Sequence, residues 1–95
     1  MDKLIKQCLV YARISTMNND VRDEIRSLIL SCQSDLKMKG VKSTDLSDPL
    51  ISRAIKLYVK GNFNTLAKDS ERLIQSYEML RDSMALSGEY KDEVN

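Results

Sequence analysis

The sequence predicts an all-α fold, a small four-helix domain with a central third helix. Apolar residues recur at spacings of three and four through four segments, which is the pattern of amphipathic helices. The three glycines, Gly40, Gly61 and Gly88, each come directly after one of these segments, where a helix is expected to end. No segment shows the sustained alternation of apolar and polar residues that indicates a strand. With 95 residues, 42% of them hydrophobic and 31% charged, the chain has the size and composition of one globular domain.

The first two helices are expected over residues 2–13 and 20–39. Each carries a single apolar face of the width that a surface helix buries. Asn18 or Asn19 can cap the second helix by accepting hydrogen bonds from the free N–H groups of its first turn. Both helices are therefore expected to pack one side against a shared core.

The strongest helix signal lies over residues 49–60. Ser47 or Asp48 can cap its first turn, and Pro49 suits the first helical position because its missing N–H is not needed there. Gly61 is expected to end this helix in a left-handed conformation. Apolar residues occupy about half of the helix circumference, more than the stripe of an ordinary surface helix. We therefore place this helix at the centre of the domain.

The fourth helix is expected over residues 65–86, so that residues 1–86 form a single helical domain. Residues 87–95 have no apolar stripe long enough to bury and are expected to form a flexible C-terminal tail. The apolar faces of the helices predict the core. Its expected members are Ile25, Leu28, Ile51, Ile55, Tyr58, Leu73 and Tyr77.

The composition excludes several kinds of chemistry. The chain has no histidine, so Ser-His-Asp and Cys-His catalysis and the usual zinc sites are ruled out. Cys8 and Cys32 stand alone on apolar helix faces and are expected to be buried, reduced thiols. The isolated glycines cannot form a phosphate-binding loop. We expect no catalytic residue, no cofactor and no metal, in a protein that is not an enzyme.

Charge and hydropathy also bear on partners and location. The net charge of +1 is too small to attract a polyanion strongly. There is no run of about 18 apolar residues and no N-terminal signal segment. The chain is therefore expected to be soluble and intracellular when it is synthesised, without a membrane partner.

Some apolar residues lie away from the faces that form the expected core. They lie on strips rich in serine or glutamine, where charged residues are few. Such residues are either scattered surface hydrophobes or part of a contact between subunits. The candidate subunit interface consists of Ser27, Leu30 and Ser34 on the second helix, with Met79 and Leu86 on the fourth.

Several short runs of the sequence together match a known pattern. They are Tyr11-Ala12-Arg13-Ile14, Asp48-Pro49-Leu50-Ile51, Ala54-Ile55, Leu57-Tyr58-Val59-Lys60, Phe63, Glu71-Arg72 and Ser76-Tyr77-Glu78-Met79-Leu80. The set resembles the small head–tail connector proteins of long-tailed bacteriophages and prophages, over about residues 4–90.

The resemblance implies a structural, head-completing adaptor that assembles as a ring under the portal of a DNA-filled phage head. Its implied partners are other copies of itself, the portal protein and the next connector or tail protein. DNA passes through the channel without sequence-specific binding. Location would be the bacterial cytoplasm during assembly and then the head–tail interface of the virion. Because connector C-termini reach toward the portal, Tyr90 and Val94 are the candidate portal contacts.

A small helical DNA-binding regulator of a phage or mobile element is the alternative. The second and third helices would then form a helix-turn-helix pair. The connection over residues 41–47 is longer than the usual turn of this motif. The third helix would also present few base-reading side chains beyond Arg53. Both features favour the connector.

Overall fold

The computed structural model describes residues 1–12, 14, 18–43, 45–63 and 67–90. The described chain forms four α-helices and a final 3₁₀ helix, and contains no strand. The elements are α1 (Asp2–Tyr11), α2 (Asn19–Met38), α3 (Pro49–Asn62), α4 (Ala67–Leu86) and η1 (Gly88–Tyr90). The predicted all-α four-helix class is confirmed, and the helix bounds agree with the predicted ones to within two residues.

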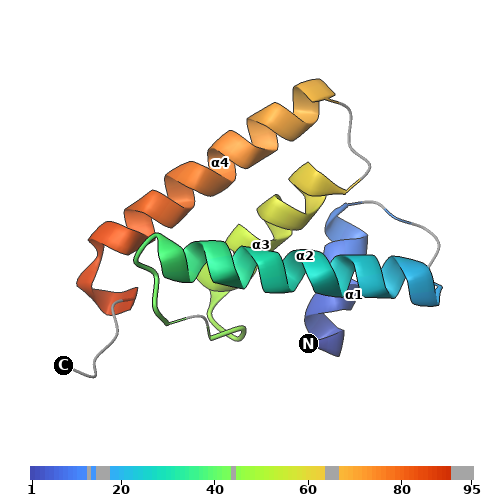
Figure 1. Ribbon diagram of the computed structural model, residues 1–95, viewed down its shortest axis with the longest axis horizontal. Helices are drawn as coiled ribbons and strands as arrows, with labels where there is room; N and C mark the ends of the chain where they lie inside the picture. Colours follow the sequence, from blue (N-terminus) through green and yellow to red (C-terminus); the bar gives the residue numbers. More distant parts are fainter. Residues whose placement is uncertain (13, 15–17, 44, 64–66, 91–95) are drawn as a thin grey trace.

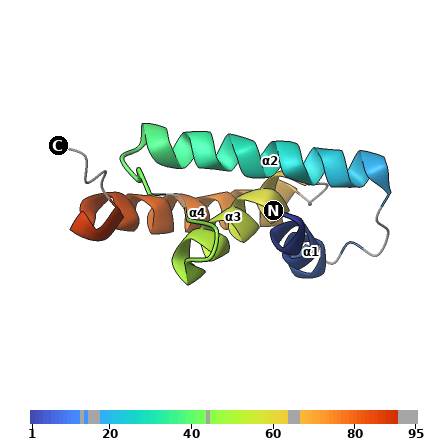
Figure 2. The same cartoon turned by 90° about the horizontal axis from the view of Figure 1, so that it is seen from below.

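Helix α2 lies along one side of a layer that contains α1, α3 and α4 (Figures 1 and 2). Within this layer α3 lies between α1 and α4, and it packs against all three of the other helices. Helices α2 and α4 approach each other at their C-terminal ends and diverge toward the opposite end of the molecule (Figure 1). The molecule measures 43 × 28 × 19 Å, so each of its two broad faces is close to the core.

Local capping explains where the helices begin and end. The side chain of Asn18 accepts a hydrogen bond from the N–H of Val21 at 2.9 Å, which caps α2. The carboxylate of Asp48 accepts from the first turn of α3, at 2.8 Å from the nitrogen of Leu50. Gly40 follows α2 with a φ of 103°, a conformation that side chains with a Cβ rarely adopt.

The core surrounds α3. Five of the seven expected core residues are buried, and the other two, Leu28 and Tyr58, are only half-buried. Those two pack on the edge of the core: the ring of Tyr58 meets the ring of Tyr77 edge to face, with 5.1 Å between centroids. Leu28 and Tyr58 therefore line the edge of the core, because helical periodicity gives a direction but not the depth of cover.

Gly61 does not end α3 as expected. Helix α3 continues through Gly61 to Asn62, and Gly61 is buried instead of forming a left-handed cap. A Cβ at this position would lie 2.7 Å from Cδ1 of Ile74, so the end of that side chain would have to shift. The carbonyl of Gly61 also accepts a hydrogen bond from the hydroxyl of Ser70. The absence of a side chain at Gly61 lets Ile74 of α4 lie close to the backbone of α3.

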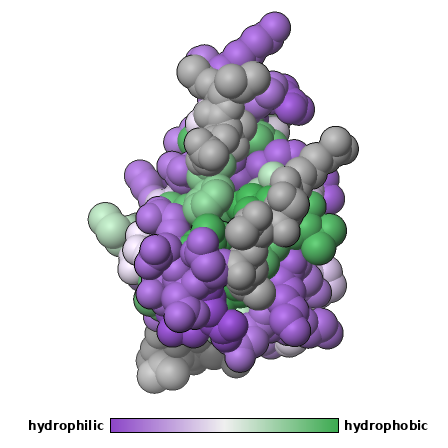
Figure 3. Space-filling model, turned by 90° about the vertical axis from the view of Figure 1, so that its right-hand side faces the viewer, coloured by the Kyte–Doolittle hydropathy of each residue, from purple (hydrophilic) through white to green (hydrophobic). Residues whose placement is uncertain are grey.

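Hydrophilic residues occupy most of the end of the molecule where α2 begins, with smaller apolar areas between them (Figure 3). Among the described residues, no helix is long and apolar enough to cross a membrane.

Candidate interaction surfaces

A polar cluster joins α2 to α4 near their C-terminal ends. The hydroxyl of Tyr77 donates to Oδ2 of Asp35 at 2.6 Å, and Nη1 of Arg81 donates to the same oxygen at 3.0 Å. Nε of Arg81 donates to the carboxylate of Asp82 at 2.9 Å. Burial disfavours the charged form of Asp35, but the hydrogen bonds from Tyr77 and Arg81 outweigh that effect and lower its pKa. Each described polar group is satisfied within the cluster, so its role is to hold two helices together.

The two cysteines carry no nucleophilic chemistry at neutral pH. Both are buried and reduced. Burial raises the pKa of the Cys8 thiol to about 11 and that of Cys32 to about 12. Both side chains therefore remain protonated and act as small apolar groups in the core.

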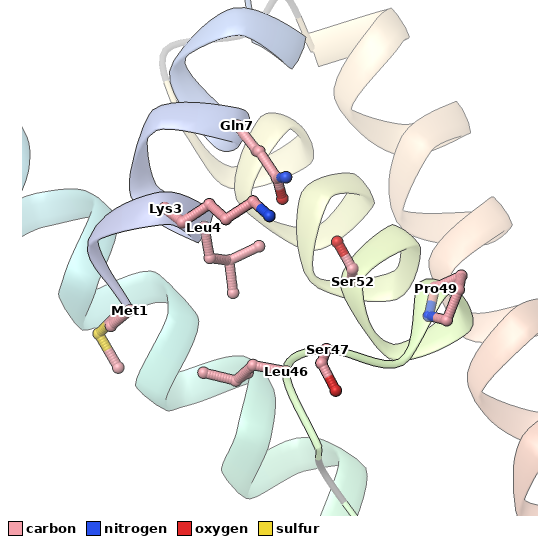
Figure 4. Close-up of a pocket in the computed structure, with 8 residues that line it drawn as sticks. All are labelled: Met1, Lys3, Leu4, Gln7, Leu46, Ser47, Pro49 and Ser52. Carbon is pink, nitrogen blue, oxygen red and sulfur yellow. The ribbon is translucent and has the colours of Figure 1, made fainter.

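A hollow of about 420 Å³ lies between α1 and the beginning of α3 (Figure 4). The polar ends of Lys3, Gln7 and Ser52 point toward it, over an apolar floor that includes Leu4 and Leu46. None of its lining residues has a carboxylate, so the hollow has no acid–base pair. Within the described chain, no three His, Cys, Asp or Glu side chains gather as metal ligands.

Two adjoining hollows that share Tyr11 lie on the side of the α1–α3–α4 layer that faces away from α2. We call the two hollows together the basic groove. The first hollow, of about 430 Å³, is lined by Lys3, Lys6, Gln7, Val10, Tyr11 and Lys56. The second, of about 360 Å³, is lined by Tyr11, Arg53, Leu57, Arg72, Leu73, Ser76, Met79 and Leu80. Five of these residues are basic and none is acidic. The groove is therefore a positively charged surface with an apolar floor.

Helix α2 presents its own exposed line of residues on the far side of the molecule. We call this line the α2 ridge: Asp20, Asp23, Ser27, Leu30 and Ser34, alternately three and four residues apart. All five are exposed, and Leu30 retains 50% of its accessible surface. A spacing of three and four residues keeps them on one side of the helix.

The structure places the candidate interface residues on separate surfaces. Ser27, Leu30 and Ser34 belong to the α2 ridge. Met79, which is 74% exposed, lines the basic groove on α4. Leu86, two helical turns further along α4, is 86% exposed. The two sets remain accessible and do not cover each other within one chain.

Tyr90, a candidate portal contact, is not exposed as the sequence suggested. Its side chain is buried in η1, and its hydroxyl donates to the carboxylate of Asp48 at 3.1 Å. Its carbonyl accepts from the N–H groups of Lys42 and Ser43 at 2.8 and 3.1 Å. The expectation of a flexible tail over residues 87–95 is therefore wrong at Tyr90, because the loop before α3 supplies a site for it. Val94, the other candidate portal contact, lies outside the described residues.

The geometry of α3 does not favour the DNA-binding alternative. Every residue of this helix is described, and only Pro49, Leu50, Arg53 and Asn62 are exposed. A recognition helix must project its base-reading side chains into the major groove. Here α3 packs against the other three helices, and of its polar side chains only those of Arg53 and Asn62 are exposed.

Sequence reasoning missed two features of these surfaces. The Asp35–Arg81 pair joins residues 46 positions apart, and no local pattern predicts such a partner. The basic groove had a weak signal: Lys3, Lys6 and Val10 follow one another at spacings of three and four on α1. Their combination with Lys56 and Arg53 depends on how α1 packs beside α3.

No family model matches the chain, and the comparisons with curated proteins and with solved structures give no match either. Function is therefore inferred from the exposed faces of the folded domain and from the resemblance of its sequence runs.

Proposed function

We propose that the protein is a structural head–tail connector of a long-tailed bacteriophage or prophage. It assembles as a ring under the portal, extends the DNA channel and links the filled head to the next connector or to the tail. It does so in the bacterial cytoplasm and then forms part of the virion. One observation carries the proposal beyond the resemblance: exposed apolar side chains lie on two separate faces, Leu30 on α2 and Met79 on α4.

Two separate faces suit a ring subunit because a closed ring uses heterologous contacts. Each subunit then offers one patch to the neighbour before it and a different patch to the neighbour after it. A symmetric dimer, in contrast, uses the same patch on both subunits. The low net charge of +1 also suits a channel that DNA must leave during ejection, since a strongly basic lumen would retain it.

Electron microscopy of the purified chain, alone and mixed with the portal protein from the same genome, tests this function. The proposal predicts closed rings bound to one end of the portal and a gene that lies beside those for portal and capsid proteins. A chain that neither assembles nor binds the portal, with its gene next to a promoter that it represses, would contradict it.

A further inference from the structure

We infer that the basic groove of one copy receives the α2 ridge of a second copy of this chain. The inference rests on the proposed function and specifies which surfaces meet. Its support lies in the charge, the apolar content and the placement of the two surfaces.

The groove is more strongly charged than the chain as a whole. The chain carries 15 basic and 14 acidic residues, yet the residues lining the groove include five basic side chains and no carboxylate. Lys3 and Lys6 of α1 are exposed at its edge. Val10, 79% exposed, and Tyr11 add apolar surface between these charges. A fitting occupant has both carboxylates and an apolar side chain on one face.

The α2 ridge has this composition. Asp20 and Asp23 are exposed at its beginning, and among the described residues neither forms an ion pair within 4.0 Å. The ridge then becomes uncharged through Ser27 and Ser34, which flank the exposed Leu30. Unpaired carboxylates followed by an apolar residue are complementary to lysines followed by a valine.

The spacing along the two helices also agrees. Asp23 and Leu30 are seven positions apart, and so are Lys3 and Val10. At 1.5 Å per residue, each pair spans about 10 Å along its helix. If α2 of one copy lies alongside α1 of the next in the same direction, a single register therefore sets Asp23 against Lys3 and Leu30 against Val10.

The two surfaces face away from each other. Tyr77 and Arg81 of α4 point toward α2, where they bind Asp35, whereas Met79 lines the groove on the other side of α4. Figure 2 shows α2 on one side of the layer that holds the groove. A ridge on one side and its complement on the other cannot pair within one chain. They join successive copies head to tail, which is the arrangement that a ring requires.

A charge exchange tests this contact. The groove variant carries Lys3→Glu and Lys6→Glu, and the ridge variant carries Asp20→Lys and Asp23→Lys. Each alone places like charges across the contact, so we expect the self-association constant, measured by sedimentation, to fall at least about tenfold. An equimolar mixture restores opposite charges in both directions. We expect the mixture to regain large assemblies in which the two variants alternate.

Matched variants control for net charge. Lys39→Glu with Lys68→Glu changes charge as the groove variant does, and Glu71→Lys with Glu78→Lys changes it as the ridge variant does. All four positions are exposed and lie outside both surfaces. These controls should associate like the wild type, and circular dichroism should show the same helix content throughout.

Three outcomes would overturn the contact. They are a wild type that stays monomeric at millimolar concentration, variants that associate normally, or a mixture that is not restored. The groove belongs to another partner if the groove variant loses binding to short duplex DNA or to an acidic peptide while its self-association is unchanged. A wild type that forms rings on the portal while the exchange fails would refute this contact and leave the proposed function intact.

Discussion

The hydroxyl of Tyr77 on α4 lies 2.6 Å from the carboxylate of Asp35 on α2 and donates a hydrogen bond to it. This bond joins two helices that diverge over the rest of their length (Figure 1). The same carboxylate oxygen accepts from Arg81, so Asp35 is the point at which α4 is fixed to α2. The relative placement of the groove and the ridge depends on this attachment.

Removing the Tyr77 hydroxyl should weaken the attachment without opening a cavity. Tyr77→Phe keeps the buried ring and its contact with Tyr58 but removes a hydrogen bond to a charged acceptor. We expect a loss of about 1–3 kcal/mol in the free energy of unfolding. Urea denaturation measures it. Tyr11→Phe is the matched control, because Tyr11 lies at the surface, and an equal loss in both variants would contradict the role of Tyr77.

The stability of the domain should fall in acid because of Asp35. Its pKa in the folded protein lies below the ordinary value of 3.8, so the unfolded chain binds the proton more readily. The contribution is complete above the unfolded pKa and is lost as the pH falls through the folded pKa. The free energy of unfolding should therefore decrease as the pH is lowered from about 5 to about 2.

Asp35→Asn should reduce the slope of this pH dependence. The variant should retain a smaller slope of the same sign, because hydrogen bonds from the backbone and side chain of Ser47 also lower the pKa of Asp45. An identical pH profile for the wild type and Asp35→Asn would show that the carboxylate is not stabilised by folding.

A side chain at the position of Gly61 should push the side chain of Ile74 out of its present place. A side chain there meets Ile74, with 2.7 Å from a Cβ to Cδ1 and 3.0 Å to Cγ1. Gly61→Val should destabilise the domain by about 1–3 kcal/mol through overpacking. Thermal unfolding measures it, and adding Ile74→Ala in the same chain should recover part of the loss. If the double variant loses more free energy of unfolding than the two single variants lose together, the close approach of Ile74 to Gly61 is contradicted.

Tyr90 should contribute to stability. Tyr90→Ala removes a buried ring and leaves space beside Asp48, so we expect a loss of about 2–4 kcal/mol. Tyr90→Phe keeps the ring and loses only the hydrogen bond, at a cost of about 0.5–1.5 kcal/mol. Denaturant titration of the two variants separates packing from hydrogen bonding. If Tyr90→Ala unfolds like the wild type, η1 does not hold the loop before α3.

The local features of the fold could be predicted from the sequence. Asn18 and Asp48 cap helices where their side chains suggested, and Gly40 directly follows α2 as expected. These signals act within a few residues, so they can be found in a linear sequence. The central place of α3 followed from its wide apolar arc.

The features that depend on contacts between helices could not be predicted in this way. Gly61 looked like a helix end because its local sequence gives no sign of α4. Tyr90 looked free because its partner, Asp48, lies 42 residues earlier and already had a role as a cap. The candidate interface residues were found individually, but their placement on different faces of the molecule required the fold.

The joining of heads to tails is the most direct test of the proposed function. Filled phage heads that lack this protein are mixed with the wild type, with Leu30→Asp or with Leu50→Asp, and then with tails, and infectious particles are counted. Leu30 and Leu50 are 50% and 44% exposed, so the two substitutions are closely matched, but only Leu30 lies on the α2 ridge. We predict that the wild type and Leu50→Asp restore infectivity while Leu30→Asp, correctly folded, does not. Heads that the wild type cannot complete would contradict the connector function, and full activity of Leu30→Asp would exclude the α2 ridge from it.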